Sequence, residues 1–171
     1  MDVYLIVLRI LHILAGVFWV GSSLMLFFFV QPTAKALGPQ GGPFMGHLTQ
    51  QRKLPVAITV AGAVTVLAGL LLYWESSAGL DGDWITSGPG LSLTVGGLFA
   101  LTAFVIGLLI VRPTVDRMGA VAGAVQASGG PPSEAQAAEL QRLQGKLRAL
   151  GTTNSALLIL AVAAMAAARY V

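Results

Sequence analysis

Long apolar runs separated by short polar stretches dominate the pattern of this chain. Four of the runs are long enough to cross a hydrocarbon core about 30 Å thick, which takes about 20 helical residues. They predict membrane-spanning helices at residues 3–30, 54–74, 91–111 and 152–168. We therefore expect an all-α membrane protein in which residues 1–171 form a single four-helix transmembrane domain.

The charges in the connections between these runs predict an orientation. Two connections are basic and one is acidic: Lys35, Arg52 and Lys53 lie in 31–53, Arg112, Arg117, Arg142, Lys146 and Arg148 lie in 112–151, and Glu75, Asp81 and Asp83 lie in 75–90. Because short loops rich in lysine and arginine stay in the cytoplasm, the two basic connections are expected inside. Both termini are then expected outside.

The second basic connection contains a loop and a helix. A small-residue stretch that ends in Ser128-Gly129-Gly130-Pro131-Pro132 is typical of a flexible loop. The next four residues, Ser133 to Gln136, match a capping box. A stripe of leucines follows, so we expect a cytoplasmic amphipathic helix at 133–150. This helix lies on the inner leaflet or extends the last span, and Gly151 would allow a break between them.

Composition supports integration into a lipid bilayer. Of the 171 residues, 56% are hydrophobic and 10% are charged, whereas soluble domains carry about 25% charged residues. The mean hydropathy is +0.80. No cysteine is present, which excludes disulfides, thiol catalysis and thiolate metal sites. The net charge of +3 is spread thinly between apolar spans, so it predicts membrane orientation and no nucleic-acid partner.

Two ionisable residues break the apolar pattern of the first span. Arg9 and His12 lie three residues apart on one helix face, which continues through Gly16, Trp19 and Ser23. An ionisable side chain at this depth costs about 2.5–3.5 kcal/mol on insertion scales, so it needs a partner, a cofactor or water. Arg9 either anchors the helix at the interface or takes part in a site. His12 either bonds to a neighbouring helix or acts as a ligand or proton carrier.

Two sets of residues are candidates for a cofactor or metal. Met165 in the last span is expected within several ångströms of the depth of His12, so His12 with Met165, or His12 alone, could hold haem b. His47 is expected near Met25 and Met45, and imidazole with soft sulfur suits copper. The copper alternative therefore uses His12, His47 and Met45.

Small residues follow regular stripes on the second and third spans. Gly62 and Gly69 lie on the second span, and Gly96 and Gly107 lie on the third with alanines between them. Small residues at such spacing let helices approach closely in lipid. A flat prosthetic group would need the same room, so the stripes fit both interpretations.

Residues 5–72 resemble part of a known group of bacterial membrane proteins. The matching features are Arg9-x-x-His12, Trp19, Gly21 and the sequence Gln51-Arg52-Lys53-Leu54-Pro55. They are similar to the HemJ-type protoporphyrinogen oxidases and the related CopD-type copper-resistance domains. The resemblance implies a multi-pass protein of the bacterial cytoplasmic (inner) membrane, association with b-type haem, and a role for Arg9 and His12 in tetrapyrrole handling.

The second half departs from the HemJ-type pattern. The lysine of the family's third span is absent from Leu91-Ser92-Leu93-Thr94, and the asparagine–glutamate pair of its last span is Asn154-Ser155 here. We therefore do not expect protoporphyrinogen oxidase activity, and haem remains the leading ligand. No G-x-S-x-G, H-E-x-x-H or P-loop motif is present either, so enzymatic activity is left open.

The sequence leaves three functions open. The first is a b-type haem protein for electron transfer or tetrapyrrole handling, with a site formed by Arg9, His12, Gly16, Trp19 and Met165. The second is a non-catalytic subunit or assembly factor that binds other membrane proteins or a second copy of itself. The third is a copper-handling protein. A transporter is less expected, because ionisable residues interrupt the interior of only one span.

Overall fold

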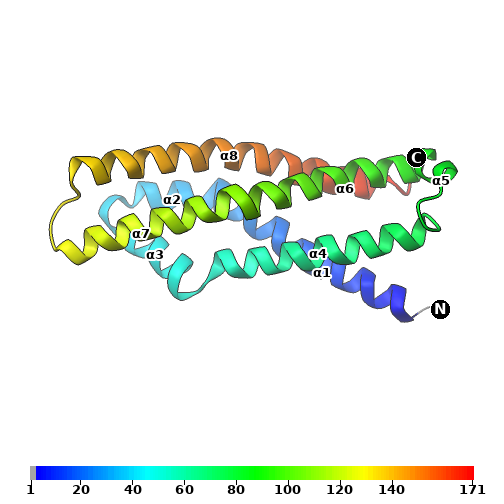
Figure 1. Ribbon diagram of the computed structural model, residues 1–171, viewed down its shortest axis with the longest axis horizontal. Helices are drawn as coiled ribbons and strands as arrows, with labels where there is room; N and C mark the ends of the chain where they lie inside the picture. The colour runs from blue at the N-terminus through cyan, green and yellow to red at the C-terminus, as the bar shows by residue number, and fades with distance from the viewer. Residues whose placement is uncertain (1–2) are drawn as a thin grey trace.

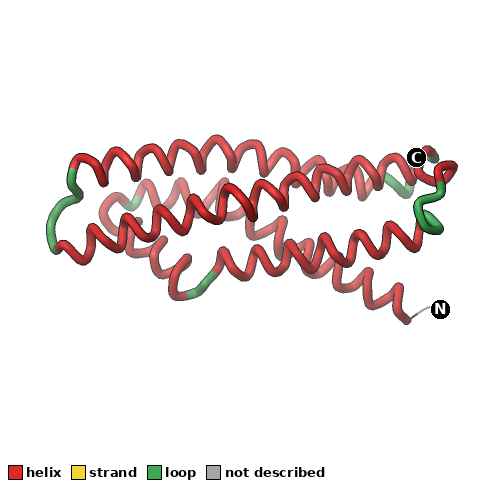
Figure 2. Tube along the Cα trace, in the orientation of Figure 1, coloured by secondary structure: helices red, strands yellow, loops and turns green. Residues whose placement is uncertain are grey.

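Four long helical stretches make up the molecule, as the apolar runs predict. The computed structural model describes residues 3–171, and this part of the chain contains helices and short connections but no strand (Figure 2). The stretches Val3–Ala36, Leu54–Ser76, Gly88–Ser128 and Glu134–Ala167 are each long and apolar enough to cross a membrane. The all-α class and the presence of four long apolar helices are confirmed.

The helical elements run as follows along the chain. The first stretch comprises α1 (Val3–Met25), the π-helical turn η1 (Leu26–Val30) and α2 (Gln31–Ala36); then come the 3₁₀ turn η2 (Gly38–Gln40), α3 (Gly41–Gly46), the π-helical turn η3 (His47–Gln51) and α4 (Leu54–Ser76). After these lie α5 (Gly82–Thr86), α6 (Gly88–Ile106), the π-helical turn η4 (Gly107–Val111), α7 (Arg112–Ser128) and α8 (Glu134–Ala167).

The long helices associate as two pairs, α1 with α4 and α6 with α8. The start of α1 and the end of α8 lie at the same end of the molecule as α5, which we call the terminal end (Figure 1). The opposite end contains α2, α3, α7 and the link from α7 to α8, and we call it the basic end because most lysines and arginines belong to it. The outer faces carry exposed large apolar side chains such as Leu14, Val17 and Leu109, which is compatible with lipid around the helices.

The two pairs meet at a small core near the middle of the bundle. Its buried members are Trp19 on α1, Ala103 on α6 and Leu158 on α8. The Trp19 ring meets Phe104 edge-on, with ring centroids 5.9 Å apart. Gly62 of α4 faces both rings, because a methyl group added there would lie 3.0 Å from Phe104 and 3.1 Å from Trp19. All four helices therefore contribute to this contact.

Two of the long stretches, Val3–Ala36 and Gly88–Ser128, contain a π-helical turn directly before an X-Pro step. The N–H of Gln31 donates to the carbonyl of Leu26, five residues back, and the N–H of Arg112 donates likewise to Gly107. A proline lacks an N–H, and its ring clashes with the carbonyl four residues earlier in a regular helix. Widening the preceding turn accommodates Pro32 and Pro113 without ending either helix.

The segment from Arg112 to Gly151 differs from the sequence-based prediction. The expected small-residue loop is helical up to Ser128, and only residues 129–133 form a non-helical link. The capping box at Ser133 and Gln136 is confirmed. The amphipathic helix 133–150 and the span 152–168 are one continuous helix, so the break at Gly151 is not observed. Packing of α7 along α8 explains the difference, because a helix of low apolar content forms once it has a neighbour.

Candidate functional site

His12 lies in the contact between α1 and α4. Its Nδ1 is 2.8 Å from the carbonyl oxygen of Thr65. Because a carbonyl oxygen only accepts hydrogen bonds, Nδ1 carries the proton and donates it. Gly69 leaves room for the ring, since a methyl group added at Gly69 would lie 2.8 Å from the His12 Cε1 atom. These contacts fix the ring and leave Nε2 without a hydrogen-bond partner among residues 3–171.

The other residues of the predicted His12 face divide between the surface and the interior. Arg9 is exposed on α1. Gly16 faces α4, where an added methyl group would lie 3.4 Å from the Thr65 side chain. Trp19 is buried in the central core, with 5% of its surface exposed. His12, Gly16 and Trp19 therefore share the packed face of α1, and Arg9 does not.

Met165 belongs to the other helix pair. A methyl group added at Gly96 of α6 would lie 3.0 Å from the Met165 Cγ atom, so Met165 packs in the contact between α6 and α8. His12 and Met165 thus lie in different helix pairs. Neither of the two best-defined hollows in the described chain is lined by His12 or by Met165. The two side chains therefore pack in two separate helix contacts, His12 between α1 and α4 and Met165 between α6 and α8.

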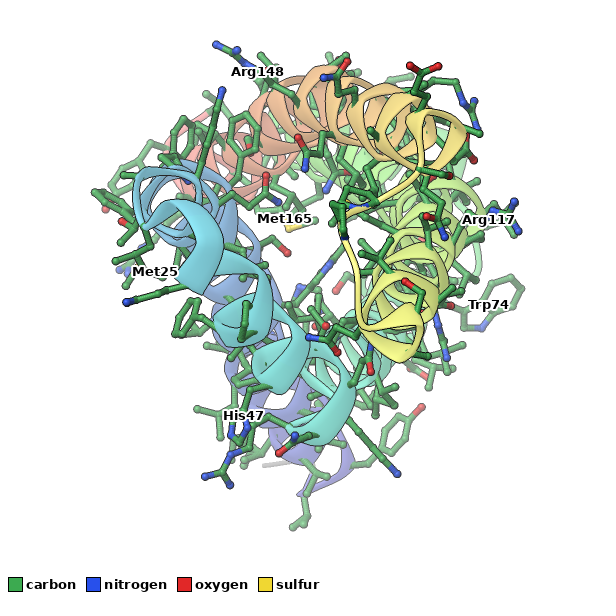
Figure 3. The ribbon with its side chains drawn as sticks, turned by 90° about the vertical axis from the view of Figure 1, so that its left-hand side faces the viewer. Met25, His47, Trp74, Arg117, Arg148 and Met165 are labelled. Atoms are coloured by element: carbon green, nitrogen blue, oxygen red, sulfur yellow. The ribbon has the colours of Figure 1, made fainter. Side chains whose placement is uncertain are left out.

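The residues of the copper alternative also lie apart. His47 is exposed, and Figure 3 shows its side chain pointing away from the centre of the bundle. Met25 is 56% exposed on the outside of the bundle, whereas Met45 lines a cavity between the two helix pairs. No group of three or more His, Asp or Glu side chains close enough to hold a metal ion occurs among residues 3–171.

The most developed cavity lies between the two helix pairs at the basic end. It has a volume of about 1060 Å³, and we call it the basic-end chamber. Trp19 and Phe104 line its inner limit, and both π-helical turns η1 and η4 contribute to its walls. Figure 3 looks along the molecule from the basic end, with Met165 near the middle of the view. The walls are mainly apolar.

The polar groups of the chamber are cationic or neutral. Among the residues that line it, the charged ones are Lys35, Arg112 and Arg148, and no carboxylate belongs to the lining. Lys35 and Arg148 are exposed, and the Arg148 side chain extends outward in Figure 3. Arg112 is half-buried. The ion pairs of the described residues join Glu139 to Arg117 at 3.6 Å and to Arg142 at 2.8 Å, so all three chamber cations lack an anionic partner.

One buried polar atom in the chamber has no partner within the chain. The Oδ1 atom of Asn154, on α8, is buried and makes no hydrogen bond to any residue in the described range. Leaving such a group unsatisfied costs about 1–3 kcal/mol. Ser155 beside it is buried as well. A bound molecule that offers a hydrogen-bond partner would offset this cost.

Gly151 also belongs to the chamber wall, where it permits a close approach. A methyl group added at Gly151 would overlap the Phe27 ring of η1. The glycine therefore lets the first pair contact α8 at the chamber, and this replaces the expected break as its structural role.

A short internal repeat in the sequence marks this site. Val30-Gln31-Pro32-Thr33 recurs as Val111-Arg112-Pro113-Thr114, and both copies directly follow a π-helical turn. Both Gln31 and Arg112 line the chamber. The predicted site did not include Gln31, Arg112, Gln50 or Asn154, and the repeat is the signal that could have identified the first two. Comparison of the chain with protein-family models, with curated proteins and with solved structures found no match.

Proposed function

We propose that this chain is a ligand-binding membrane protein whose basic-end chamber holds an amphipathic molecule. The observation that carries the proposal is the chamber itself, with about 1060 Å³ of space, apolar walls and cations as its only charged groups. Small-molecule sites are typically mostly apolar clefts of about 300–1,000 Å³ with a few convergent polar groups. The chamber has this size and this lining.

The preferred ligand has an apolar body and at least one anionic group. Its body would lie against Trp19 and Phe104, and its charged end would face the open, basic side of the chamber. A tetrapyrrole with carboxylate side chains has this chemistry, and the resemblance of residues 5–72 to HemJ-type proteins supports tetrapyrrole handling. By the positive-inside rule the chamber would open toward the cytoplasm of a bacterial inner membrane.

Binding of protoporphyrin IX by the protein in detergent tests this proposal. Trp74→Phe with Trp84→Phe leaves Trp19 as the only tryptophan, so quenching of its fluorescence reports on occupancy of the chamber. We expect saturable quenching. Gly107→Leu should abolish it, because Gly107 lines the chamber and an added Cβ there meets no atom within 4 Å.

Gly97→Leu is the matched control for this filling variant. Gly97 lies on the same helix and also has open space at its Cβ position, but it does not line the chamber. Binding should survive this change. Unchanged quenching in Gly107→Leu, or loss of quenching in both variants alike, would contradict the chamber as the binding site.

Haem bound at His12 is a second candidate, and one observation favours it. Metal-ligating histidines almost always donate their other ring N–H to a backbone carbonyl, a carboxylate or water, and Nδ1 of His12 makes such a bond to Thr65. Nε2 would then be the axial ligand of a b-type haem that carries electrons. The purified protein should show a Soret band that His12→Ala removes. A preparation that stays colourless after addition of haemin would exclude this candidate.

A further inference from the structure

The two helix pairs form two copies of one arrangement. In each copy a long helix with a π-helical turn and an X-Pro step is followed by a partner helix: Val3–Ala36 with α4, and Gly88–Ser128 with α8. Both long helices run from the terminal end to the basic end (Figure 1). Gln31 and Arg112 occupy the same position in the two copies, since each donates its backbone N–H to the carbonyl five residues back.

The two copies differ in charge at this shared position. The chamber therefore has a neutral amide from the first copy and a guanidinium from the second. Arg112 is the half-buried member of the three chamber cations, whereas Lys35 and Arg148 are exposed. A charge near a protein interior interacts more strongly with a partner than a solvated one does. Arg112 is thus the cation best placed to contribute to binding.

The surroundings of Arg112 leave its guanidinium free for an anionic ligand, because no carboxylate of the described chain pairs with it. Arg112 lines the chamber and also a neighbouring hollow of about 410 Å³, and Gln50 lines both. The Gln50 amide nitrogen lies against α7, 3.0 Å from where a methyl group at Gly119 would be. Asp116 lines only the smaller hollow, is exposed, and makes no ion pair with Arg112 in the described chain. The Gln50 amide and the unpaired Arg112 guanidinium therefore line the same two hollows.

We infer that Arg112 anchors the anionic group of the chamber ligand, a carboxylate or phosphate on an apolar body, with Gln50 as a neighbouring hydrogen-bond donor. This inference rests on the proposed function and specifies the end of the chamber at which the ligand's charge lies. Guanidinium groups bind both oxyanions through two parallel hydrogen bonds. The apolar body extends from Arg112 toward Trp19 and Phe104.

Paired acid and ester probes test the role of Arg112. The probes are protoporphyrin IX, its uncharged dimethyl ester, and a single-chain oleoyl lysophosphatidic acid, each measured by Trp19 quenching or by competition. Arg112→Gln reproduces the residue of the first copy. It should weaken binding of both acids by about tenfold or more and leave binding of the ester unchanged. Arg112→Lys should retain part of the affinity for the acids. Tighter binding of the phosphate identifies a lipid source, and tighter binding of the porphyrin acid identifies a tetrapyrrole.

The outcomes separate this inference from the proposed function. Failure of the wild-type protein to bind any of the three probes would refute both. Binding that Gly107→Leu abolishes but Arg112→Gln leaves unchanged would overturn the inference alone. Equal weakening of acid and ester by Arg112→Gln would also overturn it, because it would show that the residue shapes the chamber without contacting the charge. Gln31→Arg places a guanidinium at the equivalent position of the first copy, and it should tighten binding of the acids but not of the ester.

Discussion

The terminal half and the basic half of this bundle pack differently. Toward the terminal end, a large side chain of one helix in each pair packs against a glycine of its partner helix. His12 packs against Gly69, and Met165 packs against Gly96. Toward the basic end, the two pairs enclose the chamber. The Trp19–Phe104 contact separates the two regions.

The difference shows how local sequence features set the spacing of membrane helices. Glycines allow close approach, and packing then drives association in lipid. The π-helical turns before Pro32 and Pro113 lie in the chamber wall, where each widens the helix that carries it. Stability should therefore depend mainly on residues of the core and the terminal half, and binding on residues of the basic half.

The largest effect on stability is expected at the boundary of the two regions. Gly62→Leu would force a side chain between Trp19 and Phe104, since even a methyl group would lie 3.0–3.1 Å from their rings. Overpacking of this kind costs about 1–3 kcal/mol, and this site belongs at the upper end of the range. Thermal unfolding in detergent should show a lowered midpoint relative to wild type. The same midpoint in Gly62→Leu and Gly97→Leu would mean that the central core is not tightly packed.

A smaller effect on stability is expected for His12→Ala. The substitution removes the 2.8 Å hydrogen bond to Thr65 and empties the space beside Gly69. Interhelical hydrogen bonds in membranes contribute about 0.6 kcal/mol on average and up to about 1.7. With the lost packing, the free energy of unfolding should fall by about 1–2 kcal/mol.

His12→Ala also sharpens the distinction between the two halves. Porphyrin binding in the chamber should change by less than about twofold, because the site does not include His12. Loss of both colour and porphyrin affinity in this variant would instead place the ligand in the terminal half.

The smallest effect, and one of opposite sign, is expected in the chamber. Asn154→Leu replaces a side chain whose buried Oδ1 atom has no partner among the described residues. Removing that group should raise the free energy of unfolding by about 1 kcal/mol. It should also weaken binding of a ligand that forms a hydrogen bond with Asn154. Unfolding and Trp19 quenching measured on the same preparation would check both changes. A variant that is less stable than wild type would show that Asn154 is already satisfied.

Most of the fold could be predicted from the sequence because each element depends on local signals. Apolar length identified the four spans, and Ser133 with Gln136 identified the start of α8. The helix from Arg112 to Ser128 could not be predicted in this way. Its residues have a low mean apolar content, and the helix is supported by contacts with α8 across the short link 129–133.

The candidate site was harder to predict because it depends on the register between helices. The sequence shows an imidazole in an apolar run, but only the pairing of α1 with α4 places it against Thr65 and Gly69. Gly151 seemed a break in the helix because its neighbour Phe27 is far away in sequence. The chamber lies between the two pairs, so no single span contains its signature.

The 41-residue stretch Gly88–Ser128 has a consequence for experiments on topology. At 1.5 Å per residue it is about 60 Å long, roughly twice the thickness of the hydrocarbon core. The tip formed by residues 129–133 must then stand well clear of the headgroups on one side. A protease site or reporter epitope inserted there would be accessible from a single compartment, and would reveal which face of the membrane the chamber opens to.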